Sequence, residues 1–568
     1  MSLRADSHTG PKVGEKVERF EVEKAWLVDP ASGREGPGEI VVSGGVLESV
    51  VWLEGKDALG VTDAGVVVAP GFLDLHAHFR EPGFEDAETV ATGSAAAAHG
   101  GYTSVALMPN TEPAVDEPGV LERIRSAARS NGSPVEIFAY GAVSVDRAGE
   151  QLSAMGELAD AGVLGYSDDG APVRTSKLLR SALLYAGMLG LPVVDHAEDT
   201  AMTAGAEAAE GYVASVMGLA GWPEAAEVNA VSRDLAVFAD ALRDEPRARL
   251  HLTHVSTAAG LDLVRRAKAA GLPVVEHAED AELTAGAEAG DGYVASVLGL
   301  AGWPEAGEVN AIARDLAVLA DAVRDEPRAR LHLTHVSTAA GLDLVRRAKA
   351  AGQPVTCDVT PHHLAFTDEW LAGARRWSWE ALGADGTPRD PWADRALKAG
   401  PYNTSLRVNP PLRNATDAAA CLAALLDGTA DAVATDHAPH TVVDKEVEFG
   451  RASTGISGIE TALGVLLAFV DAGKLPLSRA IAAITSGPAG VVSAWPRVAG
   501  TPAARSRGLV EGAAADLVVF DRSDSWLVSE GSLRSKGKNS PLLGRDLAGR
   551  VLITIAGGRL AYEDVEAD

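Results

Sequence analysis

The sequence predicts an α/β protein, a (β/α)8 TIM barrel with a small β-sandwich formed by the N- and C-terminal segments. Between residues 70 and 499, short apolar runs alternate with amphipathic stretches rich in Ala and Leu, a pattern typical of parallel β/α units. At both ends of the chain, β-rich runs such as EIVVSGGVLESVVWLEG follow one another without a helical period. We therefore expect residues 1–69 and 500–568 to form the sandwich and residues 70–499 to form the barrel.

Eight apolar runs are expected to be the strands of the barrel. They lie at residues 72–79, 103–109, 136–143, 163–169, 191–198, 249–256, 353–359 and 431–439. The helical stretches between them imply that the strands are parallel, since a parallel connection needs a crossover. Active sites of such barrels lie at the C-terminal ends of the strands, so polar residues at those ends are the candidates for function.

An internal repeat interrupts this order. Residues 192–271 recur at 273–352 with an offset of 81, and the string RLHLTHVSTAAGLDLVRRAKAAG occurs unchanged in both copies. Each copy contains two β/α units, so ten strand candidates compete for eight positions in the barrel. Because closure at eight strands fixes tilt and stagger together, we expect the surplus pair to be extruded rather than inserted.

The composition restricts the partners and the compartment of the protein. With 79 acidic and 50 basic residues, the net charge of -29 argues against nucleic acid and anionic membranes as partners. The two cysteines, Cys357 and Cys421, are too few for a disulfide framework or a four-thiolate zinc site. The N-terminus lacks the apolar core of a signal peptide, and no apolar run reaches the ~18 residues of a membrane span. We therefore expect a soluble, cytoplasmic protein.

Side chains that bind metals stand at the ends of five predicted strands. His76 and His78 are two residues apart on the first strand, so both point to the same face. The other ends carry, in chain order, Asp169, His196 or His277, His254 or His335, and Asp436. Such groups are costly as unpaired core residues, whereas imidazole and carboxylate ligands together suit zinc. The sequence therefore predicts a metal centre at the mouth of the barrel.

Several strings along the chain resemble those of class I dihydroorotases of the amidohydrolase superfamily. The strings are PGFLDLHAHFREPG (70–83), GGYTSVALMPNTEP (100–113), YSDDG (166–170), DVTPHHL (358–364), VNPPLR (408–413), ATDHAPH (434–440), GISGIETALG (455–464) and SKGKNSP (535–541). The resemblance implies reversible cyclisation of N-carbamoyl-L-aspartate to (S)-dihydroorotate with loss of water, the third step of de novo pyrimidine (UMP) biosynthesis. It also implies one or two zinc ions per subunit.

The resemblance assigns roles to the predicted metal ligands. It makes His76, His78 and Asp436 the ligands of one zinc ion, and it makes Asp436 the catalytic proton carrier. Asp169 would bridge to a second zinc ion, with its neighbour Asp168 as the alternative. One HAED histidine (His196 or His277) and one THVS histidine (His254 or His335) would complete that second site. Related ring hydrolases bridge their metals with a carboxylated lysine, whereas YSDDG offers carboxylates.

A second group of residues is expected to bind the substrate. Arg80 follows His78 by two residues, so its guanidinium can fork onto the substrate carboxylate. The resemblance adds Asn110, Asn409, His440, Thr454 and Gly455 to this group, although Ser453 and Thr454 depart from the Pro-Phe that many relatives have before this Gly.

The resemblance also suggests aspartate transcarbamoylase as a partner and a homo-oligomer as the assembly. The alternative to an active enzyme is a catalytically impaired dihydroorotase-like scaffold for that transcarbamoylase. Such scaffolds lack metal histidines, whereas this chain has every ligand type and two of them in duplicate. The active enzyme is therefore the favoured hypothesis.

Overall fold

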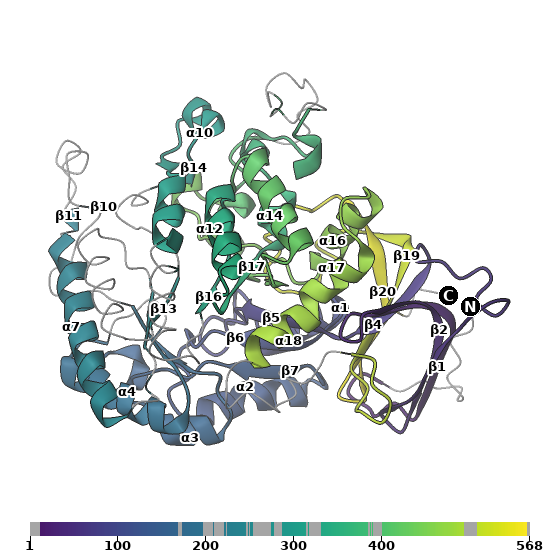
Figure 1. Ribbon diagram of the computed structural model, residues 1–568, viewed down its shortest axis with the longest axis horizontal. Coiled ribbons are helices and arrows are strands. Elements are labelled where there is room, and N and C mark those ends of the chain that lie inside the picture. The colour runs from purple at the N-terminus through teal and green to yellow at the C-terminus, as the bar shows by residue number, and fades with distance from the viewer. Residues whose placement is uncertain are drawn as a thin grey trace.

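A barrel of parallel strands lies beside a sheet built from the two ends of the chain in the computed structural model (Figure 1). The structure describes residues 12–168, 173–196, 208–209, 221–222, 224–245, 248, 250–253, 274–277, 287–313, 316, 331–383, 387, 389, 400–493 and 508–564. Residue 169 and residues 254–273 are among those outside the description. The two described ends of the chain lie at the side of the molecule formed by the sheet (Figure 1).

The sheet at the chain ends has seven strands in the order β21-β20-β19-β4-β1-β2-β3. The strands are β1 (Arg19–Asp29), β2 (Arg34–Ser43), β3 (Val46–Trp52), β4 (Val66–Pro70), β19 (Leu517–Leu527), β20 (Asp546–Ala556) and β21 (Arg559–Glu563). Alternate residues of β2 are buried, as expected of a strand with one face on a core. The pairing of β4 with β19 joins the N- and C-terminal segments in one sheet, as the sequence predicted.

The barrel wall consists of ten described parallel strands that follow one another in chain order. They are β5 (Phe72–Ala77), β6 (Tyr102–Leu107), β7 (Glu136–Ala139), β8 (Tyr166–Ser167), β9 (Val193–His196), β12 (Leu250–Thr253), β13 (Val274–His277), β16 (Leu331–Leu333), β17 (Val355–Val359) and β18 (Ala432–Val433). Each of the eight predicted runs contains or overlaps one of them. All six residues of β6 are buried, because a parallel wall is covered on both faces.

Single bridges and contacts join the separate sheets of this wall. The bridge between Gly141 and Tyr166 connects β7 to β8, and the bridge between Ala77 and His437 connects β18 to β5. Strands β13 and β16 lie in contact with each other. The ends of β5 and β18 are thereby brought together at the place where the metal ligands were predicted.

Helices cover the outside of the wall. The longer ones are α1 (Val90–His99), α2 (Pro118–Ser130), α4 (Ser176–Leu189), α7 (Glu224–Asp244), α12 (Ala339–Ala350), α14 (Ala415–Asp427), α16 (Ala462–Asp471), α17 (Leu477–Ile484) and α18 (Ser486–Ser493). The shorter ones are α3 (Met155–Asp160), α10 (Tyr293–Leu298), α13 (Pro361–Ala365) and α15 (Val442–Lys445). Helix α4 shows how the sequence fixes such an element: Thr175 caps its first turn, Gly190 ends it at a left-handed φ of 72°, and Leu179 and Leu183 are fully buried.

Where both copies of the repeat are described, they contain the same short strand pair. In the first copy β10 (Ala208–Ala209) pairs with β11 (Gly221–Trp222), and in the second β14 (Ala289–Gly290) pairs with β15 (Gly302–Trp303) in the same register. The expectation that a surplus strand pair would be extruded is wrong, because β12 pairs with β9 on one side and with β13 on the other. Insertion satisfies backbone groups that extruded strands would leave as unpaired edges.

Cys357 and Cys421 are free and buried, so neither belongs to a disulfide. Among the described residues, no helix combines the length and the apolar character needed to cross a membrane.

Candidate metal centre

Three of the predicted ligands converge at the mouth of the barrel. His76 lies near the end of β5, His335 follows β16, and Asp436 follows β18. One ligand atom from each of these residues lies within 4.8 Å of the other two. His76 Nε2 is 4.0 Å from Asp436 Oδ1, and the rings of His76 and His335 are 4.9 Å apart. The arrangement can hold a metal ion through two imidazoles and one carboxylate.

His78 lies beside this group, as the two-residue spacing predicted. Its ring is 5.2 Å from that of His76, and its Nδ1 is 3.4 Å from Asn110 Oδ1. Its backbone N–H donates to the carbonyl of His437 at 2.9 Å, which ties β5 to the end of β18. Burial lowers the pKa of His76 to about 3 and that of His78 well below its usual value. Both rings are therefore neutral at pH 7 and keep a lone pair for a metal.

His335 is held in place by Asp358. Its backbone N–H and its Nδ1 both donate to Asp358 Oδ1, at 2.8 and 2.9 Å. Although burial opposes it, the charge of Asp358 raises the pKa of His335 to about 9. The buried Nε2 has no hydrogen-bond partner among the described atoms. A buried imidazole nitrogen without a hydrogen-bond partner, close to His76 and Asp436, is what we expect of a metal ligand.

Asp436 is half-buried and follows β18, and its loss of contact with solvent raises the pKa of its carboxyl group. A second carboxylate, Asp74, lies beneath the site. It accepts hydrogen bonds from the N–H and the hydroxyl of Thr435 and from the N–H of His76 at 3.3 Å. Asp74 therefore links the backbone of β5 to the residue that precedes Asp436.

Three residues at the site adopt left-handed backbone conformations without being glycine. The φ angles are 60° for Arg80, 54° for His335 and 49° for Asp436. Such a conformation costs on the order of 1–3 kcal/mol and persists where the surroundings determine it. All three residues had been predicted as functional, so the unusual conformations fall where the chemistry is expected.

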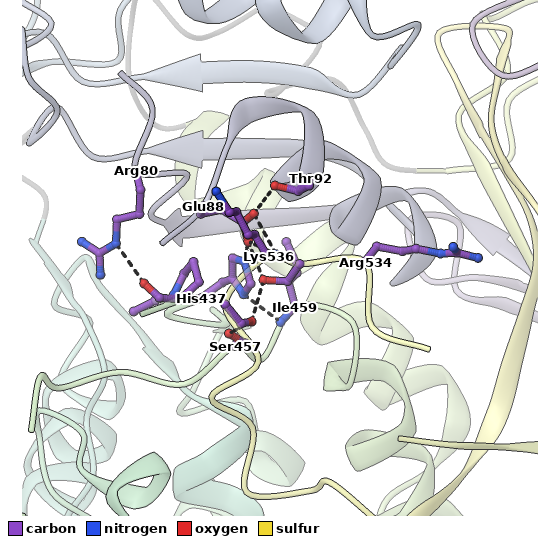
Figure 2. Close-up of polar contacts among 12 residues, drawn as sticks. Arg80, Glu88, Thr92, His437, Ser457, Ile459, Arg534 and Lys536 are labelled. Atoms are coloured by element: carbon purple, nitrogen blue, oxygen red, sulfur yellow. Dashed lines mark hydrogen bonds and ion pairs between the residues drawn. The ribbon is translucent and has the colours of Figure 1, made fainter. Parts of the chain in front are cut away.

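A buried network behind Asp436 was missed by the sequence reasoning (Figure 2). The Nδ1 of His437 accepts a hydrogen bond from the N–H of Gly458 at 3.2 Å, and its Nε2 lies 3.6 Å from Glu88 Oε2. Glu88 also accepts from the hydroxyl of Ser535 and from the N–H of Lys536 at 3.0 Å. The C-terminal segment thus braces the end of β18. The SKGKNSP string was the sequence signal for Ser535 and Lys536.

A cavity of about 620 Å³ opens beside the ligands. Arg80, Asn409, His440 and Thr454 line it together with His78 and Asp436, so most of the predicted substrate residues meet in one place. The Nε of Arg80 donates to the carbonyl of Pro439 at 3.2 Å, and its Nη2 is 3.3 Å from His440 Nε2. Arg407 also lines this cavity and was not predicted.

The backbone at Thr454 and Gly455 is engaged within the protein. His440 Nε2 donates to the carbonyl of Thr454 at 2.8 Å, and the N–H of Gly455 donates to the carbonyl of Arg407 at 2.8 Å. Asn539 donates to the carbonyl of Gly455 at 3.0 Å. Gly455 has a φ of 142°, and a Cβ there would lie 2.5 Å from the Cβ of Ala438, so only glycine fits.

Some predicted ligands fall outside the described part of the structure. These are Asp169 and His254 as whole residues and the side chains of His196 and His277. The alternative bridging residue, Asp168, is described. Its carboxylate accepts hydrogen bonds from the N–H groups of Val143 and Ser144, at 2.8 and 3.0 Å, and from the Ser144 hydroxyl at 2.5 Å.

Comparison with known proteins identifies the relatives of the chain. A profile of the family described as Dihydro-orotase-like matches residues 65–258. A dihydroorotase of Anaeromyxobacter dehalogenans is 37% identical over 549 residues, which cover 96% of this chain and 98% of that protein. A dihydroorotase of Pelotomaculum thermopropionicum is 34% identical over 541 residues, which cover 95% and 97%.

Solved structures resemble the fold of the chain. An L-hydantoinase (dihydropyrimidinase) from Arthrobacter aurescens has a TM-score of 0.59 and 21% identity, with 96% of each chain covered. A dihydropyrimidinase from Brevibacillus agri has a TM-score of 0.56 and 17% identity, with 96% and 95% covered. The likeness confirms a TIM barrel joined to a β-sandwich. Since the dihydroorotases match over almost the whole length of both chains, this chain belongs to the dihydroorotase family of the amidohydrolase superfamily.

Proposed function

We propose that the chain is an active, metal-dependent dihydroorotase that interconverts N-carbamoyl-L-aspartate and (S)-dihydroorotate. The observation that carries the proposal is the convergence of His76, His335 and Asp436. Of these, Asp436 also lines the cavity that contains Arg80 and His440. Ligands for a metal and groups that can bind a carboxylate are thereby side by side. The same cavity can hold a small cyclic amide with one negative charge.

The donor set fits a divalent metal such as zinc. His76, His78 and Asp436 would hold one ion. His335, Asp169 and either His196 or His277 would hold a second. The full engagement of Asp168 by backbone N–H groups and Ser144 supports Asp169 as the bridging carboxylate. When bound, zinc would supply Lewis acid chemistry that polarises the ring carbonyl and lowers the pKa of water.

The chain's own residues would bind the substrate and move the proton. Asp436 would take a proton on its carboxylate and deliver it to the departing ring nitrogen, and desolvation, which raises the pKa of its carboxyl group, supports this role. Arg80 and His440 would hold the carboxylate of the substrate. Asn110 and Asn409 would contact the ring, and Thr454 and Gly455 would shape the wall beside it.

The scaffold alternative finds no support in the structure or among the relatives. His76, His78, His335 and Asp436 are all present and converge, whereas a scaffold has no need of them. The structural neighbours are named as hydrolases of hydantoin and dihydropyrimidine rings. A hydrolase whose ring substrates carry no charge would not need Arg80 in the cavity. The predicted partnership with aspartate transcarbamoylase stays a prediction.

A substrate panel tests the proposal. The purified, zinc-loaded protein should hydrolyse (S)-dihydroorotate and should cyclise N-carbamoyl-L-aspartate, followed by the ultraviolet absorbance of the ring amide. Dihydrouracil and hydantoin should react far more slowly, because neither carries the carboxylate that Arg80 and His440 would bind. Faster turnover of the uncharged rings, or no turnover of dihydroorotate by protein that contains zinc, would contradict the proposal.

A further inference from the structure

We propose that Asp358 is a positioning residue that makes the second copy of the repeat, rather than the first, supply the THVS histidine of the metal centre. The inference rests on the metal site of the proposed function and deepens it. The two copies of RLHLTHVSTAAGLDLVRRAKAAG are identical, so nothing within the string itself can decide between His254 and His335. Which of the two histidines binds the metal must therefore depend on the strand that lies alongside each copy.

Asp358 holds two histidines of the second copy at once. It is buried at the end of β17, with a relative exposure of 1%. Its Oδ1 accepts from the N–H and the Nδ1 of His335, and its Oδ2 accepts from the Nε2 of His332 at 3.0 Å. The Nδ1 of His332 is 2.9 Å from the hydroxyl of Thr356 on the same strand.

These contacts fix the tautomer of the His335 ring. A carboxylate only accepts hydrogen bonds, so Nδ1 of His335 keeps its proton. When a metal displaces the other proton of the ring, the lone pair is therefore on Nε2. That Nε2 is the buried atom without a described partner, and it faces His76 and Asp436. A carboxylate behind a ligand histidine orients the ring and raises its basicity.

The strand beside the first copy lacks both polar partners. In the second copy β16 pairs with β17, where His332 stands opposite Thr356 and Leu333 opposite Cys357. In the first copy β12 pairs with β13, where His251 stands opposite Val275 and Leu252 opposite Glu276.

Extending the register of β16 and β17 by one residue puts Asp358 opposite Thr334, as His277 stands opposite Thr253 in the first copy. The hydroxyl of Thr356 is replaced by Val275, and the carboxylate of Asp358 by an imidazole. The first copy therefore has no carboxylate at the position that orients a THVS histidine. We infer that strand β12 of the first copy only forms part of the barrel wall. The identical strings of the two copies thus have different roles because the neighbouring strands differ.

A matched pair of variants in the two copies tests this inference. His332→Gln removes the histidine that shares Asp358, and His251→Gln makes the same change 81 residues earlier. Asp358→Asn keeps the size of the side chain but leaves only one acceptor oxygen for the two histidines. Metal affinity would be measured by competition of the full-length protein with a chromophoric zinc chelator. The visible spectrum of the cobalt-loaded protein would report ligand geometry, and circular dichroism would confirm folding.

Asp358→Asn is expected to weaken zinc binding by about 10- to 100-fold and to alter the cobalt spectrum, as loss of an outer partner of a ligand histidine does. His332→Gln should weaken binding in the same direction, and His251→Gln should bind as the wild type does. Wild-type affinity in folded Asp358→Asn, or an equal loss from His251→Gln and His332→Gln, would overturn the inference. Failure of the proposed function would look different, because the wild-type protein would then bind no zinc.

Discussion

Replacing Arg80 by Met tests whether the Arg80 guanidinium binds the carboxylate of the substrate. Arg80 lines the cavity, and the bond from its Nε to the carbonyl of Pro439 holds the guanidinium beside His440. Met has a similar length and no charge. Its Cβ meets the same steric cost at the left-handed φ of 60°, so the change acts on the side chain rather than on the backbone.

The expected loss follows from the bonds that a bound carboxylate would make. A hydrogen bond to a charged group contributes about 1.5–3 kcal/mol, which corresponds to roughly 10- to 150-fold in affinity. KM for (S)-dihydroorotate should therefore rise by that factor, measured from initial rates over a range of substrate concentrations. The much slower reaction with dihydrouracil should change little, because that ring offers no carboxylate.

Arg451→Met is the matched control for the loss of one positive charge. Arg451 also lines the cavity but is 80% exposed and pairs with Glu448 at the surface. Its effect on KM should be small, since exposed ion pairs contribute little. The result would contradict this role if Arg80→Met and Arg451→Met raised KM for (S)-dihydroorotate equally. It would also do so if Arg80→Met changed the reactions of (S)-dihydroorotate and dihydrouracil alike.

Three further changes have expected outcomes. Asp436→Asn keeps the shape of the side chain but removes the base, so kcat should fall by at least about 100-fold in steady-state assays, and a near-normal rate would reassign the role. Deleting residues 192–272 leaves 487 residues with one copy of the repeat, and this protein should fold and hydrolyse dihydroorotate; failure of every such deletion to fold would show that both copies are integral. Burial, aided by the charge of Glu369, raises the pKa of Asp368 to about 7. The folded protein thus binds this proton more tightly than the unfolded chain, and stability falls as pH rises toward 7. Asp368→Asn should raise the unfolding temperature at pH 8, with a smaller gain at pH 5, and an equal gain at both would refute the assignment.

The strands of the barrel could be predicted because a wall covered on both faces needs apolar residues throughout. The run at 103–109 overlaps β6, all of which is buried, and the other predicted runs contain strands for the same reason. The place of the surplus strands could not be predicted in this way. It depends on whether β12 finds a partner on both sides, and β13 provides the second one.

The metal ligands could be predicted in part, because residues two apart on a strand share a face. His76 and His78 follow that rule, and Asp436 lies beside them at the end of another predicted strand. The groups behind them could not be found from spacing. Glu88 contacts Ser535 from the far end of the chain. Asp358 was visible in the DVTPHHL string, yet its bond to His335 follows only from strand register.

The central claim, a metal-dependent dihydroorotase, is tested most directly by removing and restoring the metal. The purified protein would be treated with a chelator, dialysed and assayed with (S)-dihydroorotate before and after zinc is added, with zinc content measured in each sample. The account predicts loss of activity with the metal and its return as zinc fills the site, because the ligand groups converge with no other partner for the Nε2 of His335 among the described atoms. Full activity in protein shown to contain no metal would contradict it.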